Sequence, residues 1–468
     1  MGAGCNQVDG YYRLDASRCQ GYTRGAGACA GYSESCLNMN IYTPSSTSGS
    51  RAVMVWIHGG CFVSGSAAGY DGTTLASTHD VVVAVVQYRL GAFGFLGGEE
   101  LRERDPSGST GNWGLLDNIA SLEWLQKNLA AFGGDPSRVT IFGESSGAGS
   151  VSQLLGIPSA WPFFSKAIME SGTAAFWTYI PLENAQQSYA KVVSAAGCEG
   201  ASKKLDCLLN AASNGVSGAV SSVPCRDACN WAPVVDGVLV AGKTLNLAKA
   251  GELRPKTPII AGFNLNDGAM FVPGYPFSMH TMSKSSLKAY FSDRFGEERV
   301  GELSSLFPVP GAFPGSSMLS AHFYAAQRCE TDFSYACTAL WLTAAAPSSS
   351  VWVYQFSEPT GANGLSVHGD EIAYVFGTIA KPSAGQAKVS KSMMAFWTNF
   401  AKGGDPNGDS SLSGTARVPL EWPAWTSAAG AVINLTATPS IASVPSGSFV
   451  GCPFFDEHWD FYSGCLPP

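Results

Sequence analysis

The sequence predicts an α/β fold, a mostly parallel sheet covered by helices, on two observations. Uninterrupted apolar runs at 52–57 and 81–86 are typical of strands buried on both faces. Amphipathic stretches of helical period, such as 115–129, lie between such runs. This alternation favours parallel strands joined by helical crossovers.

The same pattern continues along the chain. Further strands are expected at 138–142, 258–262 and 351–356, and further helices at 148–155 and 391–400. The region from about 180 to 345 is less regular, and we expect it to form a helical cap over the sheet. No stretch resembles a linker between domains, so residues 1–468 are expected to form one domain.

Composition and charge exclude some partners. The 468 residues are 45% hydrophobic and carry a formal net charge of −8, without a Lys/Arg-rich run. The basic patch typical of nucleic-acid binding is therefore missing. The most apolar stretch, 81–96, contains Gln87 and Arg89 and is too short to span a membrane. No signal peptide is visible at the N-terminus, so for a secreted protein we expect this sequence to be a mature or truncated form.

The chain has 13 cysteines, and many of them lie in close pairs. Such spacing predicts local disulfides and an oxidising or secretory compartment. A zinc site is the alternative, but no Cys-x2-Cys occurs and the six histidines are scattered. We expect neither a metal nor a cofactor. The pairs are Cys198 with Cys207, Cys225 with Cys229, Cys329 with Cys337, and Cys452 with Cys465.

A candidate nucleophile follows the expected strand 138–142. The sequence Gly-Glu-Ser-Ser-Gly at 143–147 has the Gly-x-Ser-x-Gly pattern and stands between a strand and a helix. In a nucleophile elbow this sharp turn projects the serine hydroxyl above the sheet, and the glycines avoid steric clashes. In so glycine-rich a chain the alternative is an ordinary turn. The context favours Ser145 as a nucleophile.

Acyl transfer also needs donors for the developing oxyanion. The glycine loop His-Gly-Gly-Cys-Phe at 58–62 comes directly after a strand, so its backbone N–H groups can converge on a substrate oxygen. The backbone N–H of Ser146 is expected to be a further donor to the oxyanion. Without Ser145 nearby, a tight glycine turn that binds no ligand would be an equally good interpretation of this loop.

A serine needs a base to take its proton and a carboxylate to orient that base. His368, which Gly369 follows in a loop, is the favoured base, ahead of His58. Asp267, in a turn after the strand at 258–262, is the favoured acid. Asp370 and Glu371 are rivals, but residues so close in sequence rarely reach back to the ring of His368.

These motifs resemble the carboxylesterase type B family, which includes cholinesterases and fungal lipases. The likeness runs from about residue 33 to residue 435. It rests on the segments 35–44, 58–62, 87–96 and 111–150, and most specifically on Gly-Asn-Trp-Gly-Leu-Leu-Asp, Ala-Phe-Gly-Gly-Asp-Pro and Phe-Gly-Glu-Ser-Ser-Gly-Ala within the last.

The resemblance implies an α/β-hydrolase fold and a definite set of site residues. It implies a catalytic triad of Ser145, Asp267 and His368. It also implies an oxyanion hole of Gly60, Cys61 and Ser146, supporting roles near the triad for Glu144 and Ser171, and a disulfide between Cys198 and Cys207.

The sequence departs from the family pattern in four places. The acid is Asp267, where glutamate is more frequent, and Cys61 stands where glycine or alanine is usual. The N-terminal strands are expected to be shortened. The loop that carries the choline-site tryptophan of cholinesterases has no counterpart.

The expected function is hydrolysis of a small-molecule carboxylic ester of short to medium chain length through an acyl-enzyme. Phe62, Trp177 and Phe271 are expected to line the pocket. Two alternatives remain: a non-catalytic adhesion or scaffold protein on the same fold, and a lipase for long-chain acylglycerols, for which the sequence offers little lid material before residue 56.

Overall fold

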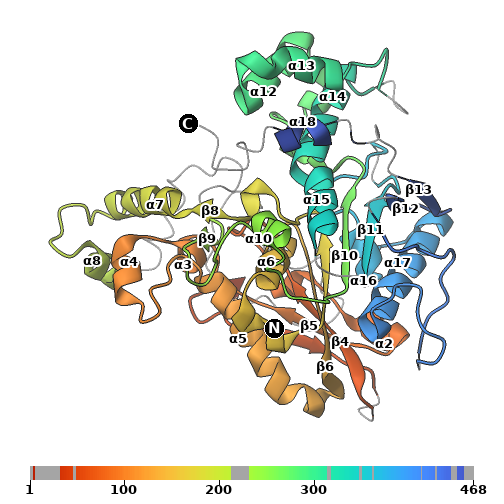
Figure 1. The fold of residues 1–468 in the computed structure, drawn as a ribbon, viewed down its shortest axis with the longest axis horizontal. Helices are drawn as coiled ribbons and strands as arrows, with labels where there is room; N and C mark the ends of the chain where they lie inside the picture. Colours follow the sequence, from red (N-terminus) through yellow and green to blue (C-terminus); the bar gives the residue numbers. More distant parts are fainter. Residues whose placement is uncertain are drawn as a thin grey trace.

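A mixed sheet forms the centre of the molecule in the computed structural model (Figure 1). The structure describes residues 4–5, 32–45, 49–211, 231–313, 318–346, 350–360, 363–412, 414–426, 429–443, 449 and 451–457. In this part of the chain the sheet has nine strands in the order β13-β12-β11-β10-β7-β6-β4-β5-β3. All neighbours are parallel except at the two edges, where β3 and β13 run antiparallel. The predicted fold class is confirmed.

The inner strands are hydrophobic and buried along their length. The predicted strands lie within or next to observed ones: β4 (Arg51–Ile57), β5 (Val82–Val86), β6 (Gly134–Glu144), β10 (Ile259–Asn264) and β11 (Val351–Phe356). The sequence reading missed the other strands of this sheet, which are β3 (Met39–Tyr42), β7 (Lys166–Glu170), β12 (Ala431–Leu435) and β13 (Ser440–Ser443). Two short two-stranded pairings stand apart, β1 (Gly4–Cys5) with β2 (Tyr32–Ser33) and β8 (Ile180–Pro181) with β9 (Val234–Val235).

Helices cover both faces of the sheet (Figure 1). One face packs against α2 (Thr73–His79), α16 (Ile372–Phe376) and α17 (Ala384–Gly403). The other packs against α3 (Gly91–Phe95), α5 (Trp113–Asn128), α6 (Ser146–Leu155) and α10 (Thr244–Ala250). The predicted helices at 115–129, 148–155 and 391–400 correspond to α5, α6 and α17.

The described part of the region 180–345 is mostly helical, as expected of a cap, and apart from β10 and α10 much of it lies in two projections (Figure 1). One holds α7 (Leu182–Ala195) and α8 (Lys204–Asn210) beside α4 (Glu99–Arg104). The other holds α11 (Ser278–Thr281), α12 (Lys284–Phe295), α13 (Val300–Leu306), α14 (Ala321–Thr331) and the C-terminal α18 (Cys452–Glu457). Helix α14 continues into α15 (Cys337–Ala345) through one π-helical turn, η7 (Asp332–Ala336).

The described residues contain three disulfides: Cys5–Cys36, Cys198–Cys207 and Cys337–Cys452. The pairing of Cys198 with Cys207 is confirmed, and the set fits an oxidising compartment. Cys225, Cys229 and Cys465 lie outside the described residues.

Two predicted local pairings are wrong, because Cys337 bonds to Cys452. Cys329 and Cys337 lie on one continuous helix, so the helical rise separates them by roughly 12 Å, whereas a disulfide needs Cα atoms within about 7 Å. Cys329 is buried and, like Cys61, takes part in no disulfide of the described residues.

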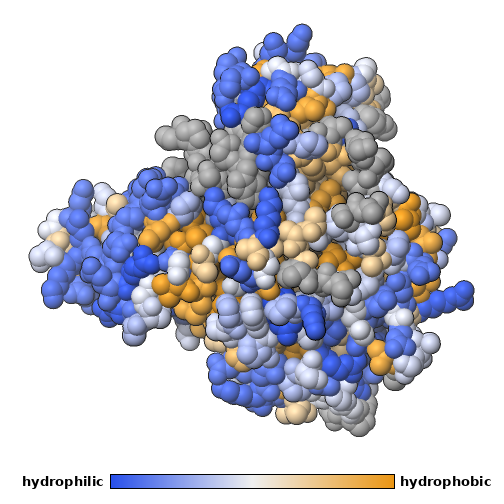
Figure 2. Space-filling view, viewed as in Figure 1, coloured by the Kyte–Doolittle hydropathy of each residue, from blue (hydrophilic) through white to orange (hydrophobic). Residues whose placement is uncertain are grey.

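None of the described helices is long and apolar enough to cross a membrane. On the face drawn in Figure 2, hydrophilic residues cover most of the outer ends of both projections.

Candidate active site

The site residues gather at the carboxyl-end edge of the sheet, where loops leave parallel strands side by side. The glycine loop follows β4, Ser145 follows β6, Ser171 follows β7, and Asp267 lies three residues after β10. Because β4, β6, β7 and β10 are neighbours in the sheet, these loops meet at one edge. Open α/β sheets generally bind ligands at this edge.

Ser145 is held in a strained turn between β6 and α6. Its backbone has φ 55° and ψ −126°, a region that side-chain-bearing residues rarely adopt. A Cβ on Gly147 would come within 2.0 Å of the Ile57 carbonyl oxygen, and a Cβ on Gly143 would come within 2.6 Å of the same atom. Both glycines are therefore required for this turn, which has the geometry expected of a nucleophile elbow.

Asp267 and His368 are brought together from positions 101 residues apart in the chain. His368 Nδ1 lies 2.6 Å from Asp267 Oδ1, and both side chains are almost fully buried. The backbone N–H of Asn264 donates to Asp267 Oδ2 at 2.8 Å, which fixes the carboxylate. Asp267 is long enough to reach the ring, although it is one methylene shorter than glutamate.

The rival carboxylates are committed to other partners. Asp370 Oδ2 accepts hydrogen bonds from the Val367 N–H at 2.7 Å and from the Thr360 hydroxyl. Glu371 accepts from Asn264 Nδ2 at 2.5 Å and from the Ser171 hydroxyl at 3.4 Å. Asp370 therefore stabilises the loop that carries the histidine, while Asp267 orients the ring.

The glycine loop lies directly against the elbow. A Cβ on Gly59 would be 3.0 Å from Ser145 Cβ and 2.8 Å from the Glu144 carbonyl oxygen. Gly60 has φ 110°, and Cys61 has φ 56° although it carries a side chain. Ser146 is the first residue of α6, where a backbone N–H has no intrahelical partner. Gly59 and Ser146 thus border Ser145, and Gly60 and Cys61 follow Gly59 in the loop.

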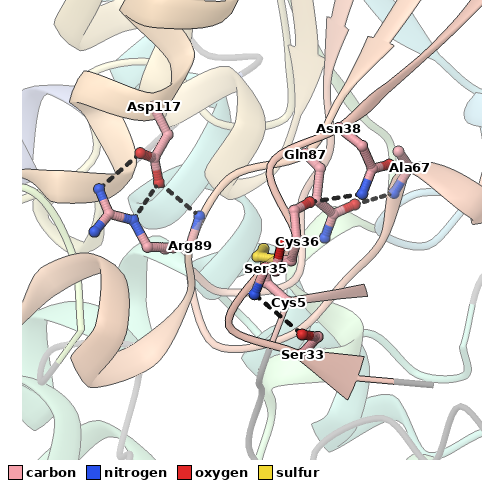
Figure 3. Close-up of a disulfide and its surroundings, with 9 residues drawn as sticks. All are labelled: Cys5, Ser33, Ser35, Cys36, Asn38, Ala67, Gln87, Arg89 and Asp117. Atoms are coloured by element: carbon pink, nitrogen blue, oxygen red, sulfur yellow. Dashed lines mark hydrogen bonds and ion pairs between the residues drawn. A yellow bond between two sulfur atoms is a disulfide. The ribbon is translucent and has the colours of Figure 1, made fainter. Parts of the chain in front are cut away.

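The segment before α3 supports the glycine loop from behind. The Tyr88 hydroxyl donates to the His58 carbonyl oxygen at 2.7 Å, and the Gly91 N–H donates to the Phe62 carbonyl oxygen at 2.8 Å. Arg89 makes a bidentate ion pair with Asp117 of α5, with Nη2 2.7 Å from Oδ1 (Figure 3). This ion pair anchors the supporting segment to a helix.

Figure 3 also shows the Cys5–Cys36 disulfide close to this supporting segment, where the Gln87 side chain accepts a hydrogen bond from the Ala67 N–H at 2.7 Å.

His58 is not suited to act as a base. Its Nδ1 faces the carbonyl oxygen of Gly59 at 2.8 Å, and its ring stacks on Tyr88 with centroids 4.5 Å apart. Complete burial lowers the pKa of His58 to about 4, so the ring is uncharged near pH 7. The ring therefore has a structural role.

Comparison with known proteins identifies the family of this chain. A sequence model of the carboxylesterase family matches residues 2–448. The chain belongs to the carboxylesterase family. It is 32% identical to human cocaine esterase over 413 residues, 81% of this chain and 69% of the relative. It is 33% identical to a medium-chain fatty acyl-CoA hydrolase precursor of Anas platyrhynchos over 400 residues, with the same two coverages.

Solved structures give the same assignment. A PNB esterase superposes with a TM-score of 0.76 at 26% identity and covers 96% of this chain and 87% of its own. The carboxylesterase EST55 of Geobacillus stearothermophilus has a TM-score of 0.76 at 28% identity, with coverages of 90% and 86%. These relatives are carboxylic ester hydrolases of the α/β-hydrolase fold, and this carboxylesterase shares both properties.

Three buried glutamates lie beneath the site of this esterase. Glu144 and Glu170 are register partners on the neighbouring strands β6 and β7, and Glu371 comes from the histidine loop. Burial raises the pKa of each, to about 8 for Glu170, whose Oε1 accepts from Trp397 Nε1 at 2.7 Å. For Glu144 and Glu371, the charges of neighbouring carboxylates raise the pKa further.

The raised pKa of Glu144 affects the charge next to the His368 ring. Glu144 Oε1 lies 3.2 Å from His368 Nε2, but the geometry is not that of a hydrogen bond. An ionised Glu144 would favour a proton on Nε2, and burial together with the neighbouring carboxylates disfavours that ionised form.

The aromatic side chains predicted for the pocket separate into two groups. Phe62 is fully buried and packs edge-on against Phe95, with centroids 5.1 Å apart, inside the core under α3 and α6. The ring of Phe271 lies 5.1 Å from that of His368, and the ring of Trp177 lies 5.9 Å from that of Tyr335. The structure therefore brings Phe271 and Trp177 to the histidine side of the site and places Phe62 in the core.

Tyr335 was not among the residues predicted for the site. Its ring lies 4.9 Å from the His368 ring and 5.7 Å from the Phe271 ring. No motif surrounds it, and its position depends on the π-helical turn η7.

In the part of the chain that the structure describes, no three or more His, Cys, Asp or Glu side chains are grouped to hold a metal ion.

Proposed function

We propose that this carboxylesterase hydrolyses short- to medium-chain esters through a covalent acyl-enzyme on Ser145. The observation that carries the proposal is the 2.6 Å hydrogen bond between Asp267 and His368, at the sheet edge where a serine is held in an elbow turn. A buried carboxylate behind a histidine fixes the tautomer and stabilises the imidazolium that forms when the ring takes a proton.

The proposed reaction has two half-reactions. His368 Nε2 removes the proton from the Ser145 hydroxyl, whose oxygen attacks the ester carbonyl carbon. The N–H groups of Gly60, Cys61 and Ser146 donate to the resulting oxyanion. His368 then protonates the departing alcohol, and an acyl-serine remains. Water, deprotonated by His368, attacks the acyl group and releases the acid.

The proposal is tested by turnover of p-nitrophenyl esters of increasing acyl length. We expect activity to peak at short or medium chains, and Ser145→Ala to lower kcat by at least about 10⁴-fold, because the covalent step is lost. Ser150→Ala, one turn further along α6, is the matched control and should retain activity. Unchanged turnover by Ser145→Ala would exclude the mechanism.

The two alternatives have separate outcomes. A scaffold protein on this fold would show no turnover with any ester of the series. A lipase would prefer emulsified long-chain triacylglycerol to soluble esters. We also propose that the chain folds as one domain and that it is secreted or resides in another oxidising compartment, which the three disulfides support.

A further inference from the structure

An aromatic wall borders the base of the proposed triad. It consists of Trp177, Phe271 and Tyr335, whose ring centroids lie 5.7 Å (Phe271 to Tyr335) and 5.9 Å (Trp177 to Tyr335) apart. Phe271 and Tyr335 both contact the His368 ring. Since the base must reach the substrate, part of the ester has to pass along this wall.

The wall carries two polar groups without a protein partner. Trp177 is 7% exposed, and its buried Nε1–H makes no hydrogen bond within the described residues. Tyr335 is 3% exposed, no hydrogen bond among the described residues involves its hydroxyl, and the hydroxyl oxygen keeps some accessible surface. The buried Trp177 donor is unsatisfied, which is unfavourable and indicates a missing ligand or water beside the wall.

The ring of Tyr335 lies beside the proposed base, with its centroid 4.9 Å from that of His368. The charges of Asp267, Glu330, Cys61 and Glu144 all act on its hydroxyl, so the hydroxyl is close to the acidic groups around the site. Burial, more than these charges, keeps the pKa of Tyr335 well above 10, and the phenol therefore remains a hydrogen-bond donor at any working pH.

The π-helical turn fixes Tyr335 in this position. Ser334 Oγ donates to Glu330 Oε1 at 2.5 Å, and the same oxygen accepts from Arg294 Nη2 at 2.9 Å. Asp332 Oδ2 accepts from the Gly451 N–H at 3.2 Å. A π-helical turn shifts the side chains that follow onto another face of the helix, and such turns are frequent at functional sites.

We propose that Tyr335 determines specificity by donating a hydrogen bond to an oxygen acceptor on a flat, aromatic part of the ester that packs on this wall. The inference rests on the proposed function and narrows its substrate class to small aryl esters that carry an ether, carbonyl or hydroxyl oxygen. The aromatic part belongs to the acyl group or to the alcohol, and the experiment separates the two.

The test compares matched substrate pairs in wild type, Tyr335→Phe and the control Tyr189→Phe, a buried tyrosine of α7. The acyl pair is ethyl 4-methoxybenzoate and ethyl 4-ethylbenzoate. The alcohol pair is 4-methoxyphenyl acetate and 4-ethylphenyl acetate. The quantity measured is the ratio of kcat/KM, methoxy over ethyl, in which intrinsic reactivity cancels between variants.

We expect Tyr335→Phe to lower this ratio about fivefold in one pair, which corresponds to one neutral hydrogen bond, and Tyr189→Phe to leave it unchanged. Ratios within twofold of wild type in both pairs would overturn the inference. Wild type must also prefer the methoxy ester of one pair after correction for alkaline hydrolysis, which needs no variant. Hydrolysis of ethyl butyrate, which lacks the aromatic group, by wild type and Tyr189→Phe tests the proposed esterase mechanism separately from this contact.

Discussion

The site depends on a few residues held in conformations that their types disfavour. Ser145, Cys61 and Ser171 all have positive φ values, and each lies within four residues of the carboxyl end of a strand, on the same sheet edge. Such strain persists where the surrounding structure enforces it, and it clusters at functional sites. Glycine motifs revealed the elbow and the loop in the sequence, because only glycine tolerates such close backbone contacts.

Cys61 is predicted to restrict the alcohol part of the ester. Its side chain projects from a position with φ 56°, where glycine would be unstrained and smaller. Cys61→Gly should therefore accelerate hydrolysis of tertiary-alcohol esters, such as tert-butyl acetate, by about tenfold relative to ethyl acetate. Cys61→Ala, which keeps Cβ, should give a smaller gain. An unchanged ratio for Cys61→Gly would show that another group crowds the alcohol.

Glu170 is predicted to make stability depend on pH. Burial raises its pKa from the usual 4.5 to about 8, so between these values the unfolded chain releases a proton that the folded protein keeps. The contribution of Glu170 to stability is fully present below pH 4.5 and is lost as pH rises through 8.

Glu170→Gln should therefore stabilise the protein by on the order of 3 kcal/mol at pH 7 and have little effect at pH 4, at about 1.4 kcal/mol per pH unit. Urea unfolding at the two pH values measures the difference. The exposed Glu297→Gln is the control and should show no such pH dependence. An equal effect of Glu170→Gln at both pH values would mean that Glu170 is ionised in the folded state.

At the scale of elements, the C-terminal helix α18 supports the turn that carries Tyr335. Cys452 bonds to Cys337, the first residue after η7. Phe455 packs on Phe333 of η7, with ring centroids 5.0 Å apart. The disulfide and the Phe455–Phe333 contact thus connect α18 to the aromatic wall.

The Cys337–Cys452 disulfide should contribute more stability than Cys198–Cys207, because it closes 115 residues rather than 9. Loop-closure entropy gives upper values of about 5 and about 2.5 kcal/mol. Cys452→Ala should therefore lower the free energy of unfolding about twice as much as Cys207→Ala in urea titrations. An equal or smaller loss for Cys452→Ala would contradict this account of the link.

At the scale of the whole molecule, the sequence predicted the features that depend on local pattern. Runs of hydrophobic residues identified most of the parallel strands. Strand β7 begins with Lys166 and ends with Glu170. Because these residues are charged, although buried, only three hydrophobic residues lie between them and the strand was not recognised. The triad could be proposed because each member follows a strand or lies in a motif, and the loops of neighbouring strands must meet.

Features that depend on distant contacts could not be predicted. Proximity in sequence suggested a disulfide between Cys329 and Cys337, but both residues lie on one helix that keeps them too far apart. Tyr335 lies in a π-helical turn that no sequence pattern marks, and neither its contact with His368 nor the packing of Phe62 against Phe95 could be inferred from the sequence. These outcomes were decided by tertiary packing, on which local composition carries no information.

The central claim is that Ser145 is the nucleophile, and covalent labelling tests it most directly. The folded protein is treated with a fluorophosphonate, and peptide mass spectrometry locates the adduct. We predict one adduct on Ser145, formed as esterase activity disappears, and none in Ser145→Ala. Esterase activity that persists without labelling, or an adduct on another residue that tracks the loss of activity, would contradict the account.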